Sequence, residues 1–231
     1  MQEENKIIRR IAVIRTDFKE KFGVPRQSGR APSAKGVIVF EPEYRLPEAL
    51  RNIEDFTYLW LIFGFDRVEY NAFSPTVRPP RLGGNERAGV FATRSPFRPN
   101  GLGLSSVKLE SVEKTEKDGT VLVVSGVDMV DGTPIYDVKP YLPYTDSHPD
   151  AQCGFAGEHF NHKLKVDFPE RLRYLVPKDK IDALIECLSD DPRPSYQNDG
   201  RTYGFTYCGF NVSFTVESDV LTVTAISTVT Q

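Results

Sequence analysis

Residues 76–104 constrain the fold most, because this run holds too much proline and glycine to form one regular element. It contains four prolines and five glycines. Proline fixes φ and lacks an N–H donor, whereas glycine permits positive φ, so a single helix or strand through the whole run is excluded. We therefore expect shaped loops around one short strand at residues 89–93.

The same run is strongly basic, although the whole protein has a net charge of −3. Its only acidic residue is Glu86, and its five arginines are Arg78, Arg81, Arg87, Arg94 and Arg98. A guanidinium presented by a shaped loop suits a phosphate, a carboxylate or an RNA backbone. An isolated arginine is more often merely solvated, but five arginines interleaved with proline and glycine favour an anion-binding surface.

The overall composition indicates a folded protein without a general affinity for nucleic acid. A length of 231 residues with 39% hydrophobic content allows one large domain, or one and a half. The isoelectric point near 5.7 means that any RNA would bind a local patch. An odd count of three cysteines and an N-terminus without an apolar leader lead us to expect a cytoplasmic protein with reduced thiols and no membrane segment.

Short β-branched segments separated by proline and glycine turns dominate the first 145 residues. Strands are expected at residues 7–16, 36–40, 56–65, 104–112, 120–127 and 135–144, and a short helix at residues 47–56. Short, closely spaced strands with few helices are typical of a β-barrel, whose closure removes exposed sheet edges. We predict a mainly β, α+β protein whose N-terminal domain, residues 1–145, is a small β-barrel.

A second, smaller unit is expected after a polar linker at residues 146–162, which lacks a periodic apolar pattern. Ile181, Leu184, Ile185 and Leu188 follow the i, i+3, i+4, i+7 spacing of an amphipathic helix at residues 178–190. Three strands are expected at residues 202–207, 210–216 and 220–226. Residues 163–231 are therefore predicted to form a small α+β domain.

Motifs of several enzyme classes are missing from the sequence. No G-x-G-x-x-G turn, Walker loop, G-x-S-x-G elbow or H-E-x-x-H helix occurs. Cys153, His159 and His162 lie in the polar linker without a fourth ligand at a typical spacing, so no metal site is expected. Hydrolase and metalloenzyme functions are therefore poorly supported.

Residues 75–109, PTVRPPRLGGNERAGVFATRSPFRPNGLGLSSVKL, resemble the signature of the TsaA/TrmO-like tRNA methyltransferases. The resemblance extends to VPRQ at residues 24–27, VDGTPIYDVKPYLP at 130–143 and DPRPSY at 191–196, and so covers nearly the whole chain. It implies a barrel that binds S-adenosylmethionine, a homodimer, and methylation of N6 of threonylcarbamoyladenosine next to the tRNA anticodon, at position 37. Methyl transfer depends on alignment and electrostatics, so it needs no conspicuous catalytic triad.

The resemblance also implies which residues contact the cofactor. They come from loops and strand ends of the barrel: Pro25, Arg26, Gln27, Asp66, Arg67, Arg94, Leu104, Ser125, Gly126, Val127 and Asp128. A simpler interpretation of Asp66 and Arg67 is that they only mark the exit of an apolar strand into water.

Candidate catalytic residues lie in the segment VDGTPIYDVKPYLP. Asp137 would act as a base or orient the acceptor. Lys139 would bind the threonyl carboxylate or a phosphate, and Tyr141 would stack or donate a hydrogen bond. Alternatively, Asp137 and Lys139 form a structural ion pair and Tyr141 belongs to the core.

The RNA contacts are expected from the arginines of the basic run and from the second domain. These residues are Arg78, Arg81, Arg87, Arg98 and Arg193. The segment DPRPSY around Arg193 is explained equally well as a helix stop with proline-constrained turns.

A non-catalytic RNA- or nucleotide-binding barrel would explain the basic run without group transfer. It predicts a steep salt dependence of RNA binding and no cofactor affinity. The methyltransferase interpretation predicts that S-adenosylmethionine raises the melting temperature. A methyltransferase acting on a small molecule would bind the cofactor but ignore tRNA.

Overall fold

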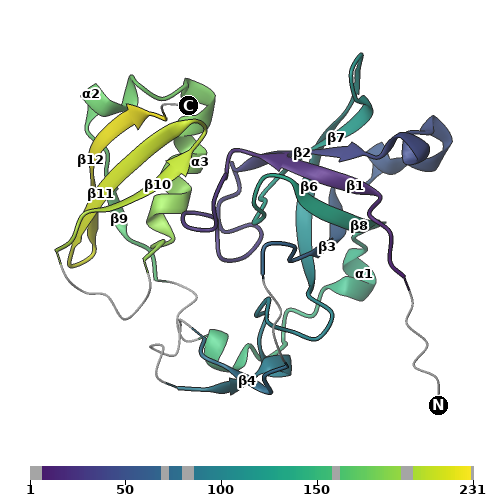
Figure 1. Ribbon diagram of the computed structural model, residues 1–231, viewed down its shortest axis with the longest axis horizontal. Helices are drawn as coiled ribbons and strands as arrows, with labels where there is room; N and C mark the ends of the chain where they lie inside the picture. Colours follow the sequence, from purple (N-terminus) through teal and green to yellow (C-terminus); the bar gives the residue numbers. More distant parts are fainter. Residues whose placement is uncertain (1–6, 69–72, 80–85, 158–161, 194–199, 230–231) are drawn as a thin grey trace.

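The computed structural model describes residues 7–68, 73–79, 86–157, 162–193 and 200–229. Its larger part is a closed, antiparallel six-stranded barrel in the order β1-β2-β7-β6-β3-β8 (Figure 1). The strands are β1 (Ala12–Thr16), β2 (Lys35–Phe40), β3 (Tyr58–Gly64), β6 (Leu102–Thr115), β7 (Gly119–Ser125) and β8 (Thr133–Pro140). The predicted barrel is therefore confirmed.

Alternation of side chains along the strands explains why the barrel closes around a packed interior. In β3, Leu59, Leu61 and Phe63 are buried inside the barrel, whereas Trp60 lies between them on the outer face. The Phe63 ring lies directly over Gly103 of β6, where an added Cβ would come within 2.3 Å of the ring. Apolar residues at alternate positions thus supply both the strand pattern and the core.

Two elements of this part differ from the prediction. Residues 47–56 do not form one helix; they form two 3₁₀ turns, η2 (Pro47–Leu50) and η3 (Ile53–Asp55), after η1 (Pro42–Tyr44). Asn52 has φ of +65° between them, which breaks any continuous helix. The strand predicted at residues 89–93 is also wrong, because pairing ends within the short hairpin β4 (Thr76–Val77) and β5 (Ala88–Gly89) and the chain then turns into η5 (Val90–Ala92).

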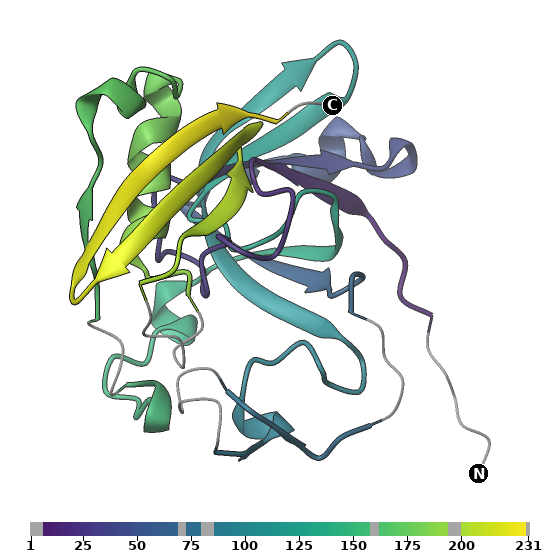
Figure 2. The ribbon, with the colours of Figure 1, turned by 60° about the vertical axis from the view of Figure 1, so that its left-hand side comes forward.

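The C-terminal part is a four-stranded sheet with one covering helix. The sheet order is β10-β11-β12-β9, and Figure 2 shows α3 lying along one face of it. Its strands are β9 (Lys165–Asp167), β10 (Tyr203–Tyr207), β11 (Phe210–Glu217) and β12 (Val220–Thr228), and its helices are α2 (Glu170–Arg173) and α3 (Lys178–Ser189). The predicted amphipathic helix and the three predicted strands are confirmed. Between the barrel and this sheet the chain forms α1 (Pro143–Asp146) and η6 (Gly154–Ala156).

The loop after β1 joins the barrel to the C-terminal sheet. Phe18 forms an isolated β-bridge with Tyr207, and their ring centroids are 5.6 Å apart. The Lys180 ammonium of α3 lies 2.6 Å from a carboxylate oxygen of Asp17. The Phe205 ring packs against Gly23 so closely that an added Cβ would lie 2.2 Å from it. The two parts therefore share one continuous hydrophobic core.

No helix within the described part of the chain is long and apolar enough to cross a membrane.

Candidate functional site

The end of β7 packs against the loop that joins β1 to β2. Gly126, with φ of +74°, turns the chain directly after Ser125. Its carbonyl oxygen accepts a hydrogen bond from the Gly29 N–H at 2.9 Å, and the Val127 N–H donates to the Ala34 carbonyl at 3.3 Å. A residue with a Cβ would be strained at this positive φ, so glycine suits the turn that brings the two segments together.

Asp128 stands at the centre of the candidate site. Its Oδ2 accepts a hydrogen bond from the Ser105 hydroxyl of β6 at 3.0 Å. Its Oδ1 is buried and has no hydrogen-bond partner of normal geometry among the described residues. A buried carboxylate oxygen without a full set of partners is unusual and suits a site that receives a donor from a ligand.

Burial is the main influence on the acidity of Asp128. It raises the pKa of this carboxyl group from 3.8 to about 6, while the Ser105 hydroxyl, the backbone N–H of Ser28 and the charge of Arg94 oppose the rise. Asp128 is thus mostly ionised at neutral pH but holds a charge in a poorly hydrated place. Carboxyl groups perturbed in this way are frequent at functional sites.

Arg94 brings the basic run to the same place. Its Nη1 donates a hydrogen bond to the Oε1 atom of Gln27 at 2.6 Å, although the two residues are 67 positions apart. Leu104, the neighbour of Ser105 on β6, points out of the barrel with 53% of its surface exposed. Gln27, Arg94 and Asp128 therefore form a cluster that offers a polar amide, a cation and a carboxylate, and Leu104 adds an exposed apolar side chain next to Ser105 in sequence.

The remaining predicted cofactor residues of the two packed segments have other partners. Pro25, which belongs to the loop between β1 and β2, is buried. The Arg26 guanidinium donates to the backbone carbonyls of Asp191 and Arg193 in the C-terminal part. The Ser125 hydroxyl donates to Glu110 Oε1 at 2.6 Å, and this bond is the main reason that the pKa of Glu110 is lowered.

Asp66 and Arg67 follow β3 at the same end of the barrel as Asp128, where β1 and β7 also end. Arg67 donates from Nη1 to the Lys19 carbonyl at 2.9 Å and from Nη2 to the Asp131 carbonyl at 2.6 Å. Asp66 lines a surface hollow with Gly132 and Tyr136. The two hydrogen bonds tie Arg67 to the segments that follow β1 and precede β8, and they do not reach Gln27, Arg94 or Asp128.

The candidate catalytic residues line the outer face of β8. Lys139 Nζ lies 3.2 Å from Asp137 Oδ2, so the ion pair of the structural alternative is present, although both side chains are substantially exposed. The Tyr141 ring packs on the outer face against Trp60, with centroids 5.4 Å apart. Trp60 is held in turn by a hydrogen bond from Nε1 to Asp146 Oδ2 at 2.8 Å. Tyr141 is therefore part of an aromatic surface cluster and lies outside the barrel core.

Strand register relates Asp137 to Leu104. Ile62 of β3 pairs with Asp137 on one side and with Leu104 on the other. Neighbouring strands are about 4.8 Å apart, so Asp137 and Leu104 are separated by about 10 Å across the outer face.

The predicted RNA-binding arginines of the basic run differ in whether they bond within the protein. Arg78 is exposed. Arg87 donates to the Thr76 hydroxyl at 2.6 Å, and Arg98 donates to the Thr93 carbonyl at 3.1 Å. Arg81 lies outside the described residues.

Arg193 differs from these arginines, because it is only 8% exposed. Its Nε and Nη2 atoms each lie 2.9 Å from an oxygen of Asp191, in a bidentate ion pair. The burial and this pairing favour the alternative that residues 191–193 shape the end of α3, whereas residues 194–196 of DPRPSY lie outside the described residues. The RNA contact of Arg193 stays a prediction.

Sequence reasoning missed Ser28 and Ser105, which contribute polar groups beside Asp128. The available signal was Ser105 itself: it occupies an inward position of a strand whose next inward residue is Val107. A hydroxyl at such a position needs a partner inside the protein.

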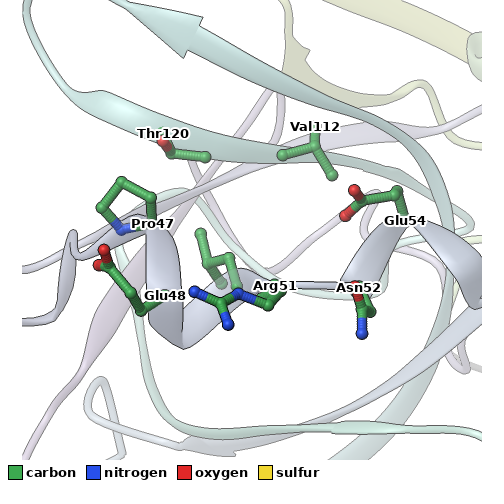
Figure 3. Close-up of a pocket in the computed structure, with 8 residues that line it drawn as sticks. Pro47, Glu48, Arg51, Asn52, Glu54, Val112 and Thr120 are labelled. Carbon is green, nitrogen blue, oxygen red and sulfur yellow. The ribbon is translucent and has the colours of Figure 1, made fainter.

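A pocket of about 270 Å³ lies elsewhere, between the 3₁₀ turns and the β6–β7 hairpin. Figure 3 shows Pro47, Glu48, Arg51 and Thr120 around it. None of the predicted site residues lines this pocket, so it is not the candidate site. Among the described residues, no group of three or more histidine, cysteine, aspartate and glutamate side chains is arranged to hold a metal ion.

Comparison with known families and proteins identifies relatives along nearly the whole chain. The tRNA-methyltransferase O N-terminal domain matches residues 13–147, and the TrmO C-terminal domain matches residues 161–229. The tRNA (adenine(37)-N6)-methyltransferase of Escherichia coli K12 is 43% identical over 215 residues, which cover 89% of this chain and 91% of that protein.

Two further relatives point to the same family. A Pseudomonas aeruginosa protein named as an S-adenosylmethionine-dependent methyltransferase, RcsF, is 42% identical over 203 residues, covering 84% of this chain and 85% of that protein. The crystal structure of TrmO from P. aeruginosa superimposes with a TM-score of 0.81 at 32% identity, covering 99% of both chains. The chain therefore belongs to the tRNA-methyltransferase O family.

Proposed function

We propose that this protein is a methyltransferase that transfers the methyl group of S-adenosylmethionine to N6 of threonylcarbamoyladenosine at position 37 of tRNA. Family membership supports the reaction class and disfavours the non-catalytic RNA-binding barrel. The observation that carries the proposal is the Asp128 cluster, in which four separate segments bring a buried, partly unpaired carboxylate close to an exposed arginine.

The residues of this cluster fit the cofactor. S-adenosylmethionine presents a carboxylate, an ammonium, ribose hydroxyls and an adenine ring. Arg94 would bind the carboxylate, Asp128 Oδ1 would accept from an N–H or O–H group, and Leu104 would contact the adenosyl portion. When bound, the cofactor supplies the methyl group together with its own leaving group.

The protein's own residues would orient the cofactor and supply the charges that bind it. Asp128 is mainly ionised at neutral pH, so it is an acceptor there. The bond from Arg94 to Gln27 aims the guanidinium. Pro25, Ser125, Gly126 and Val127 would shape the pocket through their backbone.

The acceptor base would lie along the outer face of β3 and β8. Asp137 would accept a hydrogen bond from the urea-like N6–H, which is a poor nucleophile while it keeps its proton. Lys139 would bind the threonyl carboxylate, and Tyr141 would stack on a base. Leu104 and Asp137 flank Ile62 about 10 Å apart, so a methyl donor and its acceptor lying over this outer face would reach both residues.

The lobe around the β4–β5 hairpin suits the anticodon arm. The rings of Phe73 and Phe91 are stacked with centroids 6.5 Å apart, and both are exposed, at 52% and 72%. Three arginines lie close to these rings in the sequence: Arg78, Arg87 and Arg98. Exposed aromatic rings stack on unpaired bases, and arginines of the same segment would bind the phosphates. The homodimer and the cytoplasmic location implied by the family resemblance belong to the same proposal.

The proposal is tested by methyl transfer from labelled S-adenosylmethionine to total tRNA from a strain that lacks this protein. We expect label on the modified adenosine at position 37. Asp137→Asn should slow transfer while cofactor affinity, measured by calorimetry, stays unchanged. A variant as active as the wild type would return Asp137 to its structural ion pair with Lys139.

The negative outcomes separate the alternatives. No label, with S-adenosylmethionine still raising the melting temperature, would mean a different acceptor. No label and no thermal shift would remove the support for an enzyme. Light scattering of the purified protein tests the homodimer.

A further inference from the structure

The loop that carries Gln27 and Ser28 is held from two sides. It spans residues 24–34 between β1 and β2 and contains no helix or strand. On one side its Gly29 N–H donates to Gly126 of the barrel. On the other side it contacts the C-terminal end of α3, which belongs to a different part of the chain.

Three residues of the loop contact the end of α3. The Ser33 N–H and hydroxyl donate to the two oxygens of Glu186 at 2.7 and 2.9 Å. The Arg30 Nε atom donates to Asp190 Oδ1 at 2.6 Å. Arg26 donates to two carbonyls just beyond the helix. Cations and N–H groups are favourable at this end of a helix, where the free carbonyls and the helix dipole are negative.

Burial makes the ion pair of Arg30 and Asp190 a rigid connection. The Arg30 side chain is 10% exposed and that of Asp190 is 4% exposed. A buried pair is costly to break, because removing one charge leaves the other without compensation. The pair therefore restricts the loop more than a surface salt bridge would.

The backbone beyond α3 is shaped to receive Arg26. Asp191 has φ of +50°, and its carboxylate binds the Arg193 guanidinium. Both residues supply a carbonyl to Arg26. The pairing of Asp191 with Arg193 thus fixes the two acceptors in one orientation.

We propose that Glu186 and Asp190 are positioning residues of the cofactor site, a proposal that rests on the function proposed above. They hold the loop so that Gln27 meets Arg94 and Ser28 meets Asp128. The C-terminal part would therefore set the affinity of the barrel for the cofactor as well as extend the tRNA surface. Neither residue touches the cofactor in this scheme.

The test compares variants that loosen the loop with a variant that loosens the domain contact elsewhere. Asp190→Asn and Glu186→Gln keep side-chain size and remove one charge each. The matched control, Lys180→Gln, removes the Lys180–Asp17 ion pair, which also joins α3 to the barrel side but lies outside residues 24–34. Ser33→Ala is a milder fourth variant that removes only the hydroxyl bond to Glu186.

For each variant, calorimetry gives the Kd of S-adenosylmethionine and steady-state assays give KM and kcat. We expect Kd and KM for the cofactor to rise about tenfold in Asp190→Asn and Glu186→Gln, as for coupled sites generally, with kcat changed far less. Ser33→Ala should show a smaller rise, and Lys180→Gln should bind as the wild type does. Hydrogen exchange of residues 24–34 should accelerate in Asp190→Asn and Glu186→Gln, slightly in Ser33→Ala, and not at all in Lys180→Gln.

Three outcomes would overturn the inference. In the first, exchange in the loop accelerates but the Kd is unchanged, so loop position does not matter. In the second, Lys180→Gln weakens binding as much as Asp190→Asn, so the effect is general domain loosening. In the third, the wild-type protein fails to bind S-adenosylmethionine. That result refutes the proposed function itself, whereas the first two outcomes refute only the positioning role of Glu186 and Asp190.

Discussion

Replacing Asp128 by asparagine should stabilise the protein at neutral pH and weaken its cofactor site. Asparagine has nearly the same shape and can still accept the Ser105 hydrogen bond. It removes a negative charge whose Oδ1 atom is buried without a normal hydrogen bond. The variant thus trades affinity for stability, as polar groups of binding sites often do.

The magnitude follows from the pKa of Asp128, which burial raises from 3.8 to about 6. Because the folded state holds this proton more tightly than the unfolded state, the group stabilises the fold below pH 4 and that stability is lost as the pH rises through 6. The complete loss is about 3 kcal/mol, at 1.36 kcal/mol for each pH unit between the two pKa values. Of this, about 1.4 kcal/mol is lost between pH 5 and pH 8.

Urea unfolding at pH 5 and pH 8 measures the effect. We expect the stability gain of Asp128→Asn over the wild type to be about 1.4 kcal/mol larger at pH 8 than at pH 5. Asp146→Asn is the matched control, because hydrogen bonds from the Leu142 N–H and the Trp60 indole lower the pKa of Asp146. That variant should lose stability, by the same amount at both pH values. A gain in Asp128→Asn that does not change with pH, or a net loss at pH 8, would refute the reasoning.

The other predictions concern Arg94, Gly103 and the arginine-rich surface. Arg94→Ala should weaken S-adenosylmethionine binding by about 1.5–3 kcal/mol, through loss of a charge-assisted hydrogen bond, and unchanged affinity in calorimetry would remove Arg94 from the site. Gly103→Ala should destabilise the barrel by about 1–3 kcal/mol in urea unfolding, because the new Cβ would lie 2.3 Å from the Phe63 ring. Arg78→Ala should weaken tRNA binding and make its salt dependence shallower without changing cofactor affinity, which a filter-binding titration at several salt concentrations would check.

The barrel strands could be predicted because their signal is local. In β3 and β7 apolar side chains alternate or run continuously, and turn residues separate the strands. The helix predicted at residues 47–56 failed because one residue, Asn52, takes a left-handed conformation. The strand predicted at residues 89–93 failed because its partner, β4, pairs only with Ala88 and Gly89 before the chain turns.

The candidate site could be predicted only in part. The resemblance pointed to Gln27, Arg94 and Asp128, which the structure joins through hydrogen bonds or charge. It also pointed to Arg26 and Arg67, whose described hydrogen bonds lead to other parts of the chain. A motif identifies a residue type at a position, but the direction of a long side chain depends on the acceptors that the fold places around it.

The sequence by itself determined the barrel strands, the amphipathic helix and the basic character of one loop system, because alternation, turn chemistry and charge density are properties of neighbouring residues. The tertiary structure decided which polar groups meet. Ser105 and Asp128 are 23 positions apart, Gln27 and Arg94 are 67 apart, and Arg30 and Asp190 are 160 apart. Such contacts join residues far apart in sequence, so they depend on barrel closure and on the packing of the two parts, which local pattern does not specify.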